Sequence, residues 1–261
     1  MNTAKSQSDK GKTDADVLSY ITMRRALGSL GVVLPFVLLI GGYLSECCLR
    51  TSISAYYYSP SPVLHGLFVG ILCAIGIFLI TYKGYDWIDN WIANLAGAGA
   101  LGVAIFPTKR RCLDADKTLE GALCGTEQCT TPLCEGNCTE VVFSYLHYAS
   151  AGIFFLSVAA MAWFQFTKTE WDAGTRTFAT PGEKKKLRNK VYRGSAIVIV
   201  VCIGAIVVDG VLASGGDGAL DQYSFVFWAE AVAVWAFAAA WLIKGNALFA
   251  DPPETETGGD E

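Results

Sequence analysis

Four ionisable side chains lie within otherwise apolar segments of this chain, and their types suit metal or proton chemistry. They are His65, His147, Asp209 and Glu230. Ionisable groups are costly in apolar segments, so each is a candidate functional residue. Imidazole and carboxylate groups can hold zinc and leave one position open for water. Metal-bound water is acidic enough to attack an ester or amide near neutral pH, which gives the hypothesis of a metal-dependent hydrolase.

The same residues can supply the acid–base steps of such a reaction. All four are candidate metal ligands, while Glu230 and His147 are also candidate catalytic acid–base groups. A hydroxyl group completes the catalytic set, and Ser61 is the candidate. The serines expected near the depth of these residues are Ser52, Ser54, Ser61 and Ser144.

Two other interpretations of the four residues stay open. His147 and Glu230 can act as relay groups of a proton or ion pathway. Alternatively, all four groups have structural partners: His65 faces the headgroups, Asp209 reaches water, and Glu230 bonds a Ser or Tyr of a neighbouring helix. Helix rotation decides between these interpretations.

Six apolar segments must position these residues, and each is about as long as the ~20 residues that cross a bilayer. They are expected at about 26–46, 63–82, 90–107, 142–167, 192–213 and 223–244. With 17% charged residues and a mean hydropathy of +0.38, the chain is predicted to be an all-α polytopic membrane bundle. It has no basic-aromatic motif for nucleic acid. The expected partners are therefore the bilayer and a lipid or other small-molecule substrate.

The polar segments divide the chain into three parts. Residues 1–23 are expected to be a disordered cytoplasmic N-terminus, 24–245 the transmembrane domain, and 246–261 an acidic disordered tail. Within the domain, 108–141 is an outer Cys-rich loop and 168–191 an inner basic loop.

The distribution of basic residues predicts the orientation. With the N-terminus inside, 15 of the 20 Lys and Arg residues fall on the inner side. Basic residues concentrate on the cytoplasmic side of membrane proteins. The chain is therefore expected in the plasma membrane with both termini in the cytoplasm.

The nine cysteines divide by location. Cys73 and Cys202 lie inside spans and are expected to act as small apolar residues. The other cysteines lie in outer segments: Cys47, Cys48, Cys112, Cys124, Cys129, Cys134 and Cys138. Disulfides form on an oxidising side of the membrane, so two or three bridges are expected there, with a metal site as the alternative. A Cys-rich outer loop also fits a receptor or assembly protein.

Small residues recur at four-residue spacing in two spans and predict close helix packing. They are Gly66, Gly70 and Ala74 in the second span, and Asn90, Asn94, Ala98 and Gly102 in the third. A polar pore lined by Asn90 and Asn94 is the alternative.

Several short motifs resemble an uncharacterised family of bacterial six-span membrane proteins. They are Ser52-Ile-Ser54-Ala-Tyr56-Tyr57-Tyr58, Phe68-Val-Gly70, Tyr82-Lys-Gly84-Tyr85, Phe106-Pro107-Thr108, His147-Tyr148, and Glu230 with Trp241-Leu-Ile-Lys244-Gly245. The resemblance covers most of the spans and implies a six-span fold without an activity. The Cys-rich loop looks like an addition to it.

A second, smaller resemblance concerns Ser61 and His65, whose spacing is similar to part of the pattern of the CREST membrane hydrolases. That superfamily includes alkaline ceramidases and the progestin and adipoQ receptors, and the resemblance implies zinc-dependent hydrolysis of a lipid. Its members usually have seven spans and a zinc site of three histidines. This chain has two histidines, so Asp209 or Glu230 would have to replace the third ligand.

Overall fold

The computed structural model describes residues 2–46, 49–84, 86–108, 111–113, 126–128, 138–168, 171–172, 177–178, 183–212 and 224–245. Its long helices are α1 (Asn2–Glu46), α2 (Pro62–Thr81), α3 (Trp87–Ile105), α4 (Cys138–Ala160), α5 (Glu183–Leu212) and α6 (Phe225–Lys244). A 3₁₀ helix, η1 (Ser54–Tyr58), follows α1, and a π-helical turn, η3 (Met161–Gln165), ends α4. Strand β1 (Arg111–Leu113) pairs in parallel with β2 (Thr126–Gln128), and β3 (Trp171–Asp172) pairs antiparallel with β4 (Thr177–Phe178).

All six predicted spans are confirmed as helices long and apolar enough to cross a membrane. Their apolar stretches run over 19–45, 62–81, 87–105, 141–165, 184–212 and 225–244. Backbone groups in a lipid core must be bonded within the protein, and a helix achieves this within one segment. The fold is therefore an all-α bundle that is compatible with a multi-pass membrane protein.

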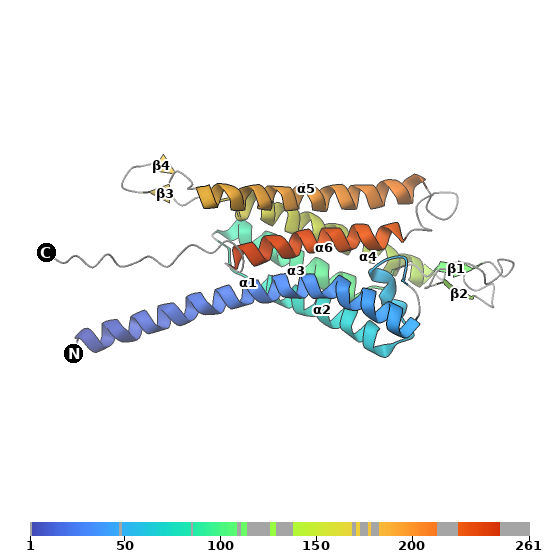
Figure 1. Ribbon diagram of the computed structural model, residues 1–261, viewed down its shortest axis with the longest axis horizontal. Coiled ribbons are helices and arrows are strands. Elements are labelled where there is room, and N and C mark those ends of the chain that lie inside the picture. Colours follow the sequence, from blue (N-terminus) through green and yellow to red (C-terminus); the bar gives the residue numbers. More distant parts are fainter. Residues whose placement is uncertain are drawn as a thin grey trace.

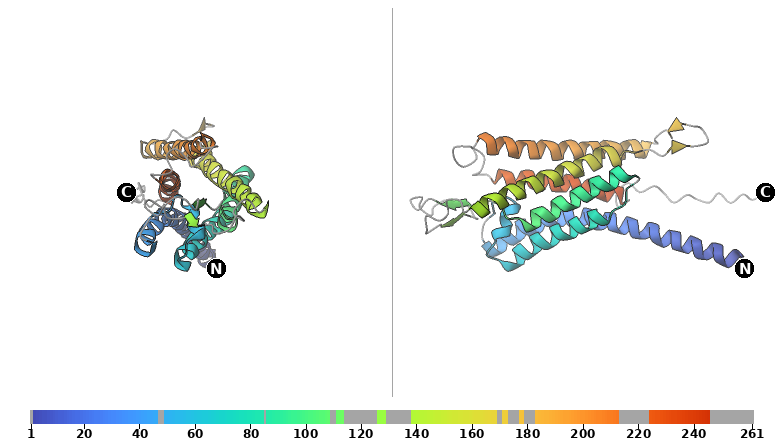
Figure 2. Two further views of the ribbon diagram at one scale, coloured as in Figure 1. Left: turned by 90° about the vertical axis from the view of Figure 1, so that its right-hand side faces the viewer. Right: turned by 180° about the vertical axis from the view of Figure 1, so that it is seen from behind.

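The helices form a closed ring in chain order. Each helix packs against its neighbours in the sequence, and α6 closes the ring against α1, as the end-on view in Figure 2 shows. Buried aromatic side chains, including Phe68, Phe237 and Trp241, fill the interior. Large apolar side chains such as Ile197 and Val201 of α5 face outward, as expected for contact with lipid.

Helix α1 begins much earlier than the sequence suggested. Residues 2–23 were expected to be disordered, but they continue the helix toward the N-terminus, where it extends beyond the bundle (Figure 1). No proline precedes Pro35, and adding residues to an existing helix is far easier than starting a new one. Ala, Lys and Gln residues in this segment also favour helix.

Close packing between α2 and α3 involves Gly76 and Gly97, which are not among the small residues predicted to form the packing faces. A Cβ atom on Gly97 would lie 2.6 Å from the carbonyl oxygen of Gly76, so these two backbones meet directly. By contrast, nothing lies within 4 Å of a Cβ added to Gly66 or Gly70. The packing face predicted for α2 therefore has the wrong rotation, because Gly76 lies on a different face of this helix from Gly66 and Gly70.

The cysteine predictions are only partly covered by the structure. Cys73 and Cys202 are free thiols that pack against the core, as expected. Cys112 lies in β1 and Cys138 begins α4. The other outer cysteines lie outside the described residues, as does the acidic tail, so disulfides in the Cys-rich loop stay a prediction.

Candidate functional site

The segment between α1 and α2 covers one end of the helix ring and positions the main polar cluster. We call this the η1 end, and the end that holds Arg24, Lys168 and Lys244 the basic end. The backbone N–H of Phe227, in the first turn of α6, donates to the carbonyl of Thr51 at 2.9 Å. This bond fixes the start of η1 over the beginning of α6. Ser54 is buried as a result, at 7% exposure.

Glu230 of α6 bonds the first residues of η1. Its Oε2 accepts from the backbone N–H of Ile53 at 2.6 Å, and its Oε1 accepts from the Ser54 hydroxyl at 3.3 Å. The first N–H groups of a helix have no partner within the helix, and a carboxylate is well suited to accept from them. Glu230 therefore caps η1 from another helix, which matches the structural interpretation that Glu230 bonds a serine.

His147 of α4 also contacts Ser54. Its Nε2 lies 3.1 Å from Ser54 Oγ, and its Nδ1 lies 2.7 Å from the carbonyl oxygen of Phe106. The imidazole is 3% exposed, so both contacts lie away from the surface. Three segments distant in sequence thus meet in one chain of hydrogen bonds, which we call the Ser54 cluster: His147, Ser54 and Glu230.

The Ser54 cluster must hold one proton more than its fully deprotonated form. The Phe106 carbonyl only accepts, so Nδ1 of His147 carries a hydrogen. The contacts from Ser54 Oγ to His147 and to Glu230 need two hydrogens, and the hydroxyl supplies one. The second hydrogen must be on His147 Nε2 or on Glu230. One proton therefore links an imidazole and a carboxylate through the serine hydroxyl.

The other predicted site residues lie apart from this cluster. His65 bonds the carbonyl of Tyr57 through Nδ1 at 2.6 Å and stacks edge-on against the Tyr57 ring. Asp209 lies on the half-exposed part of α5, and Ser61 precedes the first turn of α2. Among the described residues, no three His, Cys, Asp or Glu side chains form a group that could hold a metal ion. The structure thus brings together His147 and Glu230 of the predicted set.

Ser54 is the central residue of the site, whereas sequence reasoning favoured Ser61. Both serines were expected at a similar depth, and the spacing of Ser61 and His65 suggested a pair. The structure places Ser54 in a short helix between spans, where its hydroxyl points inward to two partners. The run of polar and aromatic residues from Ser52 to Tyr58 is the signal in the sequence that points to this segment.

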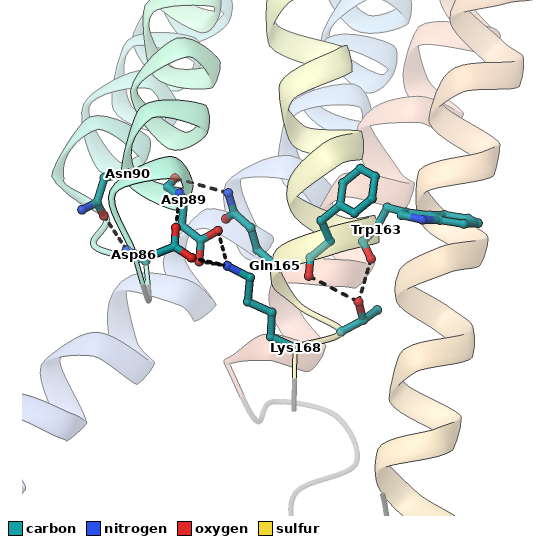
Figure 3. Close-up of polar contacts among 9 residues, drawn as sticks. Asp86, Asp89, Asn90, Trp163, Gln165 and Lys168 are labelled. Atoms are coloured by element: carbon teal, nitrogen blue, oxygen red, sulfur yellow. Dashed lines mark hydrogen bonds and ion pairs between the residues drawn. The ribbon is translucent and has the colours of Figure 1, made fainter. Parts of the chain in front are cut away.

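A second polar cluster lies at the basic end and joins α3 to the end of α4 (Figure 3). Lys168 Nζ lies 2.7 and 2.8 Å from the two carboxylate oxygens of Asp89, and 2.9 Å from Asp86 Oδ2. Asp86 also caps α3 by accepting from the Asp89 N–H at 3.0 Å. Gln165 donates to the Asp89 carbonyl at 3.2 Å. We call these four residues the Lys168 cluster.

The ionisation of the Lys168 cluster follows from these bonds. The hydrogen bond from Lys168, followed by that from the Asp89 N–H, lowers the pKa of Asp86 below its usual value. Partial burial alone would lower the pKa of Lys168, but the bonds to Asp89 and Asp86 outweigh it and raise that pKa. The Lys168 cluster is thus a set of ion pairs that holds the start of α3 against the end of α4, which is a structural role.

Comparisons with known proteins add no family to these observations. No protein-family model, curated protein or solved structure matches the chain.

Proposed function

We propose that this multi-pass membrane protein is proton-coupled, with the Ser54 cluster as its proton-binding relay. The observation that carries the proposal is the position of Ser54 Oγ within hydrogen-bond distance of both His147 Nε2 and Glu230 Oε1. A hydroxyl group can accept a proton from one neighbour while it donates its own to the other. A proton can therefore move between imidazole and carboxylate without a large motion of the chain.

Infrared difference spectroscopy tests proton binding directly. Purified protein is titrated between pH 5 and 8, and the carboxyl band of a protonated glutamic acid is followed. The band should change with pH in wild type and vanish in Glu230→Gln. Asp209→Asn is the matched control, because it removes another membrane-embedded carboxylate that lies outside the cluster, and it should keep the band.

Liposome flux measurements test the coupling. Protein is reconstituted with a pH-sensitive dye inside, and a potassium diffusion potential drives protons across the membrane. Wild type should move protons, and both Ser54→Ala and Glu230→Gln should slow this flux by about a hundredfold or more, as expected for the loss of a positioned proton-transfer group. Flux in Glu230→Gln equal to that of wild type would refute the proposal.

Hydrolysis of a lipid is the second candidate function, and the Ser54–His147 contact favours it. Ser54 would be the nucleophile and His147 the general base, with the Phe106 carbonyl holding the imidazole in the required tautomer. A fluorophosphonate probe should then label wild type and not Ser54→Ala. The metal-dependent form of this hypothesis predicts near-stoichiometric zinc in the purified protein that is lost in His147→Ala.

The distribution of basic residues also supports a proposal for the location and orientation of the protein. We place the basic end in the cytoplasm and the protein in the plasma membrane, because basic residues are retained on the cytoplasmic side. A receptor or assembly role for the Cys-rich loop predicts a different pattern. Such a protein would tolerate Glu230→Gln and fail when Cys124 or Cys134 becomes Ser.

A further inference from the structure

The basic end contains an aromatic platform with a cation on each side. Trp241 of α6 packs edge-on against Tyr82 and against Phe166, with ring centroids 5.1 Å apart in both pairs. The guanidinium of Arg24 lies 5.7 Å from the Tyr82 ring centroid, and Lys244 Nζ lies 5.5 Å from that of Phe166. The rings thus hold two cations from α1 and α6 at the same end of the bundle.

The end of α6 allows α1 to approach this closely. A Cβ on Gly245 would lie 3.0 Å from Arg25 Cγ and 3.2 Å from Arg24 Cβ, so glycine leaves room for the arginine pair. Arg25 Nε donates to the Gly245 carbonyl at 2.9 Å. This bond places the positive charge of Arg25 at the partly negative C-terminus of α6, while the Arg24 guanidinium lies over the Tyr82 ring.

The charges around this platform repel one another. The Lys244 ammonium is repelled by three cations, namely Arg24 of α1 and Lys185 and Arg188 of α5. The carboxylate of Asp89 attracts it. Asp89 is itself bonded by Lys168 through both carboxylate oxygens. Cations from α1, α5 and α6 therefore lie close together at the basic end.

Arg24 adds an independent indication of a ligand. Its Nε is shielded from solvent and has no hydrogen-bond acceptor within the described part of the chain. A buried donor without an acceptor is energetically costly, so such groups usually form a hydrogen bond to some partner. The acceptor must be anionic or polar, and it must reach the basic end between α1 and α6.

We propose that Arg24 and Lys244, with Lys185 and Arg188 around them, bind the phosphate group of an anionic phospholipid at the basic end. A guanidinium matches phosphate in geometry and charge, and a lysine adds a point charge. Clustered basic residues beside membrane spans bind anionic headgroups, and aromatic rings favour the same interfacial depth. This site is separate from the Ser54 cluster and does not depend on the proposed function.

Lipid titration of the purified full-length protein tests the site. Short-chain phosphatidylglycerol is titrated in detergent, and binding is followed by native mass spectrometry and by the shift in melting temperature. Phosphatidylcholine, whose headgroup has no net charge, is the comparison lipid. Phosphatidylglycerol should bind at least about tenfold more tightly, and its affinity should fall with added salt.

Two variants of Arg24 distinguish a built site from general surface charge. Arg24→Gln should weaken phosphatidylglycerol binding about tenfold, as expected for the loss of a charge-assisted hydrogen bond. Arg24→Lys keeps the charge but loses the Nε donor, so its affinity for phosphatidylglycerol should lie between those of wild type and Arg24→Gln. Lys83→Gln removes an exposed cation beside the end of α2 and should stay within about twofold of wild type.

Inorganic phosphate separates the two sources of the ligand group. Displacement of phosphatidylglycerol by phosphate in wild type supports recognition of the phosphate itself. Binding of phosphate without binding of phosphatidylglycerol would overturn the lipid assignment. Equal lipid affinity in wild type and Arg24→Gln, with both eluting as folded protein, would overturn the site.

Discussion

At the residue scale, one buried hydroxyl group links two ionisable side chains that come from different helices. Ser54 bonds a histidine of α4 and a glutamate of α6, while its own segment follows α1. Neither long side chain bonds the other directly in the described contacts. The hydroxyl is thus both the structural link and the only proton carrier between them in this set of contacts.

Replacing Ser54 by alanine should destabilise the protein. The change leaves His147 Nε2 without its partner in a site where the ring is 3% exposed. An unsatisfied buried polar group costs about 1–3 kcal/mol, so the melting temperature in detergent should fall by several degrees. Ser157→Ala, a half-buried serine of α4, is the control and should change it little. Equal melting temperatures for the two variants would contradict the bonding described.

The Lys168 cluster should make stability depend on pH at both extremes. The pKa of Asp86 is lowered from 3.8, so its contribution is complete above that pH and is lost as the pH falls through the lower folded value. The pKa of Lys168 is raised from 10.5, so its contribution is complete below that pH and is lost as the pH rises through the higher folded value.

Melting curves across pH 3 to 11 measure this dependence. Asp86→Asn should remove part of the acidic decline, and Lys168→Gln should remove part of the alkaline decline. Both effects should shrink in high salt, because the Asp86–Lys168 pair is partly exposed to solvent. Profiles parallel to that of wild type would show that the ion pairs do not contribute.

At the element scale, the ring depends on backbone contact between α2 and α3. Gly97→Ala would place a Cβ 2.6 Å from both the Gly76 carbonyl and Ile80 Cγ1. The helices would have to separate, which should cost about 1–3 kcal/mol. Gly70→Ala, with nothing within 4 Å, should be neutral or stabilise by up to about 1 kcal/mol. Thermal unfolding of both variants checks the contrast, and a tolerated Gly97→Ala would contradict the packing.

The positions of the spans could be predicted from the sequence, because the ability of a segment to cross a membrane depends on its length and apolar composition. Helix rotation could not, because the α2 glycines occur on more than one face and one sequence does not distinguish them. Because helix rotation was not known, the sequence also could not show which polar residues meet in the site. His147 and Glu230 both contact Ser54, but predicted depth alone could not separate them from Asp209 or from His65, which bonds Tyr57. Ser54 was hardest to predict as the centre, since it lies between spans where no periodicity applies.

At the scale of the whole molecule, the proposed orientation predicts which reporter works at the C-terminus. Green fluorescent protein fused after Glu261 should fluoresce in a bacterial host, because it folds in the cytoplasm. Alkaline phosphatase at the same position should be inactive, since it needs export to form its disulfides. The opposite result would place the basic end outside and would reverse the assignment of the two ends.

The ring that α6 closes also sets an order of events during synthesis. Glu230 follows Ile53 by 177 residues, and chains grow at roughly 5–20 residues per second. The N–H groups at the start of η1 thus exist for roughly 10–35 s before their carboxylate partner leaves the ribosome. Until then, water or lipid headgroups must occupy them. Helix α6 therefore closes the ring of helices and supplies the carboxylate of the Ser54 cluster, so the cluster can assemble only after α6 has been synthesised.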